Sequence, residues 1–402
     1  MRRHLVFAYR LGTLAVVVWA VHGALAPAED PRFDLDAVRG LFPAAARVEA
    51  PRVPGGWSRV RNAEGIELGS VVSTSPTADR ITGYAGPVPV LIAIRPDGRV
   101  SGLQLLANRE SPEYVEEVVA SGMLDRWRGL SAAQAAAADV DTVSGATWTS
   151  RAIREGVRFR LSQLAGQPGA VVSAAAGGAG WKDAVTIALV AAGLALCFTR
   201  SKWHPRWRVL LAVAVVAWLG FVTGSMISQT LVFGWVGSPP APLERPGLVV
   251  LALAALATPA LSGRPFYCTY LCPHGAAQEL IGRLSPWRRR VPRGLARWLT
   301  LIPGAALMAA LGLVYSGAPV GWLSSMEPFG AYLFTGAAAL ALAAVGLALS
   351  VILKRPWCRF GCATGALLRF LQRPRGAAGL GRADIVAGAA AALAVLWRVV
   401  GR

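Results

Sequence analysis

Acidic residues are scarce over most of this 402-residue chain. Residues 27–183 hold 18 acidic and 17 basic residues, whereas the rest of the chain, which carries the long apolar runs, holds 4 acidic and 24 basic residues. The net charge of +19 therefore lies in the apolar part and does not indicate a nucleic-acid binder. No carboxylate is expected in the middle of an apolar run, so the sequence does not support a proton or ion pathway through this chain alone.

Histidine and cysteine are also scarce, with 4 and 5 residues. The histidines are not placed to pair as haem ligands within the apolar part. Four of the cysteines, however, fall in two copies of one pattern that runs from Arg-Pro to Gly-Ala, at 264–276 and 355–366. The fifth, Cys197, is expected to be a small packing residue.

Each copy carries its cysteines at i and i+4, which would place both sulfurs on one face of a helix. Two such pairs together make a site with four thiolates. In a reducing compartment this favours an iron–sulfur cluster, with structural zinc as the alternative. The predicted ligands are Cys268, Cys272, Cys358 and Cys362.

Apolar runs long enough, or nearly so, to cross a ~30 Å hydrocarbon layer predict about seven membrane spans. They lie near residues 7–25, 184–199, 209–232, 247–261, 298–315, 332–353 and 383–397. Because Arg and Lys gather in alternate loops, those loops are expected on the cytoplasmic side. Both cysteine pairs are then predicted at the cytoplasmic edge of the membrane and residues 27–182 on the far side. Residues 1–26 are expected to be a retained anchor, with a cleaved signal as the alternative.

Residues 27–165 predict an extracytoplasmic α+β domain. Two apolar β-branched segments, 88–94 and 100–106, flank Arg-Pro-Asp-Gly-Arg and predict a hairpin. Helical patterns follow near 112–121, 131–138 and 151–164. In the last of them Ile153, Val157, Leu161 and Leu164 share one face. Residues 166–182, rich in Gly and Ala, have the composition of a flexible tether to the membrane domain, 183–402.

Small and hydroxylated residues precede the last of these helices, from Asp141 to Ser150. A helix N-terminus with glycine and hydroxyl groups suits a phosphate, because backbone N–H groups and the helix dipole favour an anion. The same residue types also serve as ordinary helix caps, and the residues alone leave both readings open.

The pattern Asp-x-x-Ser-Gly-Ala-Thr, Asp141 to Thr147, resembles the flavinylation motif of FMN-binding domains. Such domains occur in NosR/NirI proteins and in the RnfG and NqrC subunits of ion-pumping redox complexes. Residues 83–90 and 109–112 resemble two further blocks of this domain, and the resemblance covers roughly residues 65–165.

The resemblance implies that a flavin transferase links FMN to Thr147 through a phosphoester bond, with Thr149 as the second candidate. Asp141 would be the acid needed for the transfer, and Glu110 a contact to the bound flavin. The remaining cofactor-binding residues that it implies are Tyr84, Ser144, Gly145 and Ala146.

The membrane half is similar to NosR-type proteins, whose Cys-x3-Cys-Pro repeats are assigned to iron–sulfur binding, here a 4Fe–4S cluster. The first copy keeps the proline, Pro273, and the second has Ala363. The C-terminal ferredoxin-like region is missing, so the chain resembles a shortened relative, and its connection to nitrous oxide metabolism stays open.

These features predict a multi-pass protein of the bacterial inner membrane with its FMN domain in the periplasm. We expect an electron-transfer component rather than a substrate-converting enzyme. It would receive electrons from a cytoplasmic donor or a quinol and supply an extracytoplasmic reductase. The alternative is a redox-responsive regulatory membrane protein of the NosR type.

Overall fold

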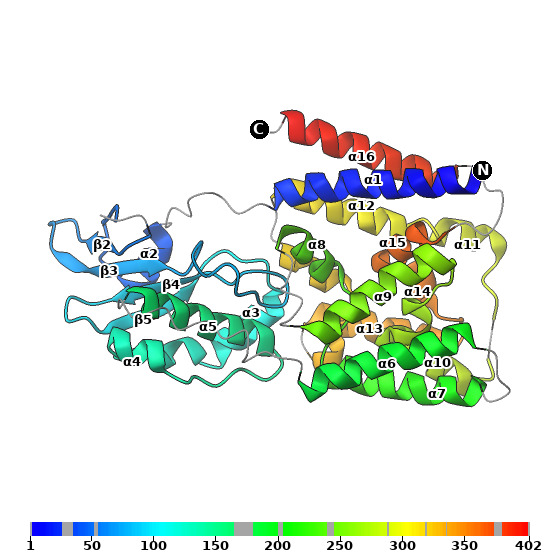
Figure 1. The fold of residues 1–402 in the computed structure, drawn as a ribbon, viewed down its shortest axis with the longest axis horizontal. Coiled ribbons are helices and arrows are strands. Elements are labelled where there is room, and N and C mark those ends of the chain that lie inside the picture. Colours follow the sequence, from blue (N-terminus) through cyan, green and yellow to red (C-terminus); the bar gives the residue numbers. More distant parts are fainter. Residues whose placement is uncertain are drawn as a thin grey trace. The chain divides into compact units, whose positions relative to one another are not determined.

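The computed structural model describes most of the chain, as two compact units that we treat separately. One unit contains residues 27–176 with 238–240, and the other contains the rest (Figure 1). The described residues are 2–25, 35–51, 55–164, 180–199, 204–238, 245–287, 289–317, 320–334, 336–373 and 380–400. Most of the predicted tether, 166–182, lies outside them.

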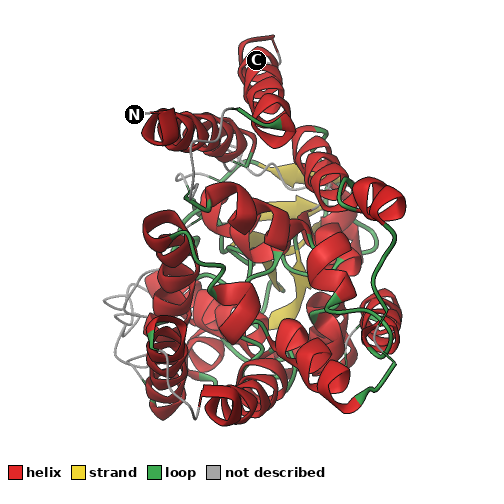
Figure 2. Ribbon diagram, turned by 90° about the vertical axis from the view of Figure 1, so that its right-hand side faces the viewer, coloured by secondary structure: helices red, strands yellow, loops and turns green. Residues whose placement is uncertain are grey.

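The smaller unit is built on a five-stranded antiparallel sheet in the order β1-β2-β3-β4-β5. All strands of the described chain belong to it (Figure 2). The strands are β1 (Arg47–Glu49), β2 (Ser58–Arg61), β3 (Glu67–Ser73), β4 (Val90–Ile94) and β5 (Val100–Leu105). The predicted hairpin is confirmed as β4 and β5, and Gly98 takes the left-handed conformation in its turn, φ 79°.

Both faces of this sheet are covered. Val72, Val90 and Ile92 pack on one face with the buried face of α5 (Thr147–Leu164). Their neighbours along the strands, Val71 and Leu91, pack on the other face with α2 (Leu35–Leu41). Alternate residues of a strand point to opposite faces, so β3 and β4 can be apolar at successive positions.

The three predicted helices of this unit are present, as α3 (Pro112–Ala120), α4 (Ala132–Ala137) and α5. Between α3 and α4 lies the 3₁₀ turn η1 (Met123–Trp127). The predicted inward face of α5 is confirmed, because Ile153, Val157 and Leu161 are fully buried. Helix α5 begins four residues earlier than the apolar pattern suggested, so Thr147 is its first residue.

The larger unit is entirely helical, and five of its helical segments are long and apolar enough to cross a membrane. They are His4–Ala24 in α1 (Arg2–Ala24), α6 (Trp181–Phe198), His204–Val222 in α7 (His204–Val215) and η3 (Val216–Val222), Arg293–Tyr315 in α11 (Arg293–Leu299) and α12 (Ile302–Tyr315), and α16 (Arg382–Val400). Two further predicted spans correspond to the shorter helices α9 (Pro246–Ser262) and α13 (Ala337–Ser350). The described residues therefore support a membrane protein with five candidate spans, and the predicted number of seven is not confirmed.

The predicted span 209–232 is interrupted in the structure. Helix α7 passes into the π-helical segment η3, residues 223–228 are not helical, and α8 (Gln229–Gly237) follows as a separate short helix. A short 3₁₀ pair, η5 (Val320–Met326) and η6 (Gly330–Leu333), lies between α12 and α13. The break falls on residues 223–228, where a glycine and three hydroxylated residues interrupt the apolar run.

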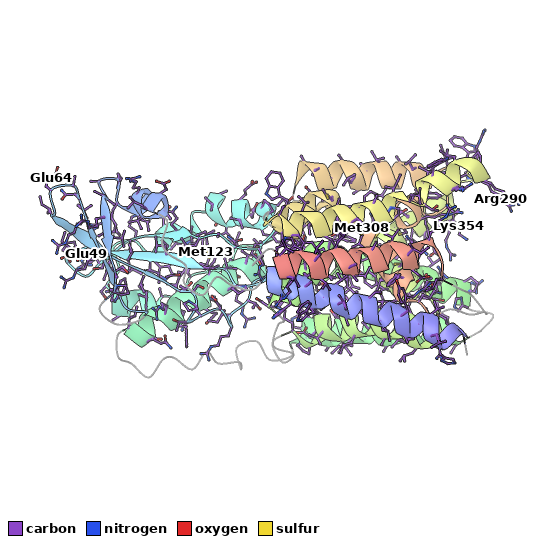
Figure 3. All side chains as sticks on the ribbon, turned by 90° about the horizontal axis from the view of Figure 1, so that it is seen from above. Glu49, Glu64, Met123, Arg290, Met308 and Lys354 are labelled. Atoms are coloured by element: carbon purple, nitrogen blue, oxygen red, sulfur yellow. The ribbon has the colours of Figure 1, made fainter. Side chains whose placement is uncertain are left out.

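Helix α1 packs against α16 along its length (Figures 1 and 3). Arg10 forms an ion pair with Asp384, 2.6 Å between nitrogen and oxygen, and the Asp384 side chain is 1% exposed. Tyr9 donates a hydrogen bond to the Asp384 carbonyl oxygen, at 3.0 Å. A buried charge needs such a partner, and the pair joins the first and last helices of the unit.

Candidate cofactor sites

Thr147 lies at the N-terminus of α5 with an exposed side chain. Its hydroxyl makes one long hydrogen bond, to the Val143 carbonyl oxygen at 3.4 Å. Gly145, two residues earlier, has φ 86° and open space where a Cβ would stand. The start of a helix attracts phosphate, and here the reacting hydroxyl is accessible, so the residues present fit a phosphate-linked flavin.

Thr149 is placed differently. It is 1% exposed, and its hydroxyl donates a short hydrogen bond to the Glu110 carboxylate. A buried and hydrogen-bonded hydroxyl is a poor acceptor for a bulky group, so the geometry favours Thr147 over Thr149.

Glu110 faces the interior, with 3% of its surface exposed. Its carboxylate accepts the backbone N–H groups of Tyr84, at 3.0 Å, and Ala85, at 2.7 Å, in addition to the Thr149 hydroxyl. A Cβ at Gly83 would lie 2.7 Å from a Glu110 oxygen. The Glu110 carboxylate thus connects the predicted blocks at 83–90 and 109–112 with the first turn of α5, and it holds these loops in place.

Tyr84 is nearly buried, and its ring meets Tyr114 edge to face, with 5.6 Å between centroids. Burial raises the pKa of the Tyr114 phenol well above its usual value, and the nearby Tyr84 and Glu110 add to the shift. Tyr114 therefore stays protonated. Sequence reasoning did not identify it, because an apolar helix face is an ordinary place for a tyrosine.

Of the other motif residues, some have exposed side chains and others are buried in the core. Asp141 and Ser144 are exposed, and Asp141 lies 3.5 Å from Arg126. Ala146 is buried in the core, while the Ser150 hydroxyl accepts the Val143 N–H and donates to the Ala146 carbonyl oxygen. Ser150, which sequence reasoning did not single out, fixes the loop that presents Gly145 and Thr147.

The four predicted cysteine ligands are brought into one region of the membrane unit. Cys272 interacts electrostatically with the other three thiols, and Cys362 interacts with Cys268 and Cys358. Each copy contributes two of these four cysteines. Cys268 lies in the π-helical turn η4 (Tyr267–Leu271) and Cys358 in α14 (Pro356–Phe360). The duplication in the sequence therefore converges on a single site.

The second cysteine of each copy does not share a helix with the first, as the i, i+4 spacing suggested. Cys272 is instead the N-cap of α10 (Pro273–Leu284), and Cys362 is the N-cap of α15 (Ala363–Leu371). The sulfurs accept the N–H groups of Gly275 at 3.4 Å and Gly365 at 3.1 Å. A four-thiolate cluster is anionic, and two helix N-termini with N–H donors are suited to hold it.

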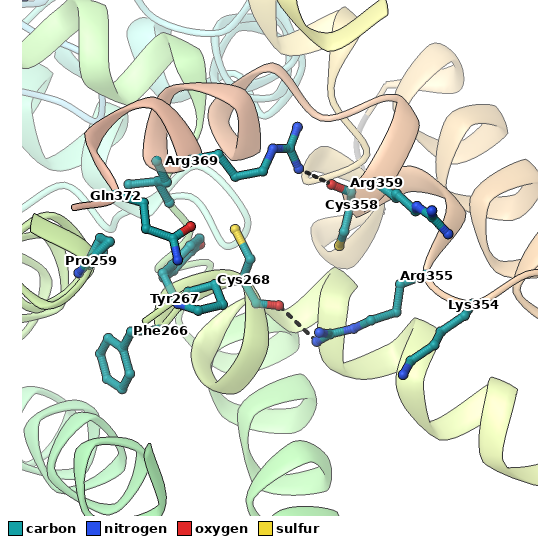
Figure 4. Close-up of a pocket in the computed structure, with 13 residues that line it drawn as sticks. Pro259, Phe266, Tyr267, Cys268, Lys354, Arg355, Cys358, Arg359, Arg369 and Gln372 are labelled. Carbon is teal, nitrogen blue, oxygen red and sulfur yellow. Dashed lines mark hydrogen bonds between the residues drawn. The ribbon is translucent and has the colours of Figure 1, made fainter. Parts of the chain in front are cut away.

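Polar contacts cross between the two copies at this site. Gln278, two residues after the first copy, donates to the Cys358 sulfur at 3.4 Å and accepts the Trp357 N–H at 3.1 Å. Arg355 of the second copy donates to the Cys268 carbonyl oxygen at 2.8 Å (Figure 4). These bonds hold both pairs in fixed relative positions.

A cavity of about 280 Å³ adjoins the cysteines. Figure 4 shows Cys268 and Cys358 at this cavity, with Arg369 donating to the Cys358 carbonyl oxygen at 2.8 Å. Its lining includes four basic residues and no acidic one; the basic residues are Lys354, Arg355, Arg359 and Arg369. This charge complements an anionic cluster, although no three His, Cys, Asp or Glu side chains of the described chain are so placed that they could hold a metal ion.

The cysteine motifs are largely buried in the helical unit, beside the basic cavity. Two of their contacts reach distant segments of the chain. The Ile227 N–H donates to the Tyr267 hydroxyl at 2.9 Å, and the Tyr332 hydroxyl lies 3.1 Å from Nδ1 of His274. Helices α10 and α15 each begin directly after a cysteine.

Glu327 lies between α12 and α13, outside the candidate spans, and its side chain is buried, with 3% of its surface exposed. Its carboxylate accepts the Thr364 hydroxyl at 2.9 Å and the Gln229 N–H at 2.8 Å. No sequence pattern marks this residue, because its partners come from two distant segments.

Comparison with known proteins agrees with both sites. The FMN-binding domain family matches residues 83–162, and the 4Fe–4S binding domain family matches twice, at 245–292 and 335–381. The chain contains an FMN-binding domain and a 4Fe–4S binding domain. Its cofactors are therefore FMN and a 4Fe–4S cluster, as the resemblance to NosR/NirI-type proteins implied.

Individual relatives point in the same direction. The "Putative electron transport protein YccM" of Escherichia coli (strain K12) is 25% identical over 209 residues, 47% of this chain and 57% of the relative. The G subunit of the Na(+)-translocating ferredoxin:NAD(+) oxidoreductase complex of Acetobacterium woodii is 29% identical over 113 residues, 25% of this chain and 52% of the relative.

The G subunit of the ion-translocating oxidoreductase complex of Stutzerimonas stutzeri is 32% identical over 127 residues, 26% of this chain and 56% of the relative. The chain thus spans about half the length of the curated relatives it matches, and no solved structure gives a significant match. Together with the two domains, these relatives support electron transfer in a membrane context.

Proposed function

We propose that this protein carries electrons across the bacterial inner membrane, between a 4Fe–4S centre in its helical unit and an FMN attached to Thr147 on the periplasmic side. The observation that carries the proposal is the presence on one chain of two 4Fe–4S domain matches, whose four cysteines meet in one region, and of an exposed flavin-motif hydroxyl. The basic loops favour the orientation, with the flavin unit outside.

Each site's residues have a defined task in this scheme. Cys268, Cys272, Cys358 and Cys362 hold the cluster, and Arg355 and Arg369 offset its negative charge. FMN, when bound, accepts and releases electrons singly or in pairs. Thr147 fixes the flavin covalently through a flavin transferase, while Glu110 keeps the loops beside it in place.

Two contacts of the cysteine motifs support the electron path. A cluster at the membrane edge would leave a ~30 Å hydrocarbon layer between the two cofactors. The motifs contact residues 227 and 332, in segments that the apolar pattern predicts toward the far ends of spans. These contacts favour a cluster that lies deeper in the membrane than the basic loops. The partners are proposed to be a cytoplasmic donor or a quinol and a periplasmic acceptor.

Electron flow in sealed vesicles tests the proposal. Vesicles containing the flavinylated full chain receive a reduced donor on one side and an impermeant acceptor on the other. We expect acceptor reduction in the wild type, and none in Thr147→Val or Cys268→Ser. Undiminished flux in both variants would show that electrons take another route.

A further inference from the structure

A second cavity of the helical unit, of about 390 Å³, lies between α7, the C-terminal half of α10 and the segment just before α14. Figure 3 shows Lys354, which lines it, at the same end of the unit as Arg290. Its lining residues are all polar except Gly282. The cavity therefore suits a polar group and not a hydrocarbon chain.

This cavity carries an excess of positive charge. Among the described residues that line it, one is acidic, Glu279, and four are basic: Arg208, Arg283, Lys354 and Arg355. Lys354 is exposed and makes no hydrogen bond or ion pair with another described residue. One carboxylate cannot neutralise four cations, so an anion in the cavity would be stabilised.

Two of the guanidinium groups are held in place before any ligand binds. The Glu279 carboxylate accepts from Arg208 at 2.8 and 2.7 Å and from Arg283 at 2.8 Å. The Arg208 guanidinium also lies over the Tyr270 ring, 5.1 Å from its centroid, and its side chain is 23% exposed. A fixed guanidinium binds phosphate oxygens in pairs, and salt screens a partly buried charge less than an exposed one.

The surroundings of the cavity are those of a membrane surface. Trp207 precedes Arg208 and is 58% exposed, and Trp287, four residues after Arg283, is 71% exposed. Tryptophan gathers at the level of the lipid head groups. Leu284, next to Arg283, is 86% exposed. A polar cavity and an exposed apolar surface thus follow one another along the chain, as a lipid head group and its acyl chains require.

We propose that this cavity binds the phosphate of an anionic phospholipid. Basic pockets between membrane helices at the cytoplasmic surface hold such head groups. Arg208, Arg283 and Lys354 bind the phosphate oxygens, while the acyl chains lie on the apolar surface outside. Charge that only sets the orientation of a membrane protein acts from exposed loops and needs no such cavity. The proposal does not rest on the proposed electron path.

Two basic residues at this end of the unit provide a matched pair of variants. Lys354→Gln removes one charge from the cavity and leaves no described residue without its partner. Arg290→Gln removes one charge from an exposed residue that is not among those lining the cavity. Lys354→Arg keeps the charge and tests for rescue.

The full chain is purified in a neutral detergent, and binding of fluorescent phosphatidylglycerol and phosphatidylcholine is titrated. We expect phosphatidylglycerol to bind more tightly. Lys354→Gln should weaken its binding about 5-fold, and the double variant Lys354→Gln with Arg283→Gln about 25-fold. Arg290→Gln and Lys354→Arg should bind as the wild type does, and thermal unfolding checks that each variant is folded.

Equal weakening by Lys354→Gln and Arg290→Gln would overturn the proposal, because the attraction would then belong to the whole basic surface. Equal binding of phosphatidylcholine would overturn it as well, since no net negative charge would be recognised. Displacement of phosphatidylglycerol by an equal concentration of inorganic phosphate would show that the cavity takes free phosphate instead of a lipid.

Discussion

The flavin site and the cysteine site hold their cofactors by opposite means. Thr147 is an exposed hydroxyl at a helix start, within a contiguous motif. The cysteines are largely buried, come from two copies of a repeat and are joined by contacts between the copies. A covalently attached group needs one accessible atom, whereas a cluster needs four ligands in fixed positions. The cysteine site should therefore be the more sensitive to small changes.

The largest expected effect comes from removing a thiolate. Serine at Cys272 still caps α10, because serine is a good N-cap, so the fold is kept while the ligand is lost. We expect Cys272→Ser to lose the cluster's visible absorption and electron paramagnetic resonance signal but to retain FMN. Cys197→Ser, outside both motifs, is the control and should keep both cofactors.

The second prediction concerns the two threonines of the flavin motif. Thr147→Val should abolish in-gel flavin fluorescence and leave the cluster signal intact, since its hydroxyl is exposed and bonded only weakly. Thr149→Val should keep the flavin but destabilise the smaller unit by about 1–3 kcal/mol, because it leaves the Glu110 carboxylate short of a donor. Peptide mass spectrometry and thermal unfolding check the two results. A flavin found on Thr149 would reverse this assignment.

The third prediction compares equivalent glycines in the two copies. A Cβ at Gly275 would lie 2.8 Å from the Cys268 carbonyl oxygen and 3.4 Å from the Cys358 sulfur, so the backbone must shift. At Gly365 the closest atom is the Cys362 sulfur at 3.4 Å. We expect Gly275→Ala to lower the iron content per chain clearly more than Gly365→Ala does. Equal losses would mean that the two copies hold the cluster symmetrically.

The smallest structural effect is expected at Asp141. Its contact with Arg126 is exposed, and exposed ion pairs contribute little to stability. Asp141→Asn should therefore leave the unfolding temperature unchanged, while flavin incorporation falls if the acid serves the transferase. Normal flavin incorporation would remove Asp141 from the transfer reaction.

Local patterns made much of this architecture predictable. The hairpin of β4 and β5, the buried face of α5 and the apolar segments all follow from periodicity and composition. Strands β1 to β3 were not predicted, because β1 and β2 are short and polar residues interrupt the apolar pattern of all three.

The candidate sites, too, could be predicted only where their residues stand in a local motif. Thr147 and the cysteines stand in motifs that are visible along the chain. Glu327 and Gln229 do not, since each acquires its role only from partners that folding brings to it.

Electron exchange between the two cofactors within one chain is the most direct test of the account. The flavin of the purified protein is photoreduced, and flavin absorbance and the cluster signal are followed together. The account predicts that the two centres exchange electrons at a rate independent of protein concentration, and that Cys272→Ser abolishes the exchange. A rate proportional to protein concentration, or no exchange at all, would contradict it.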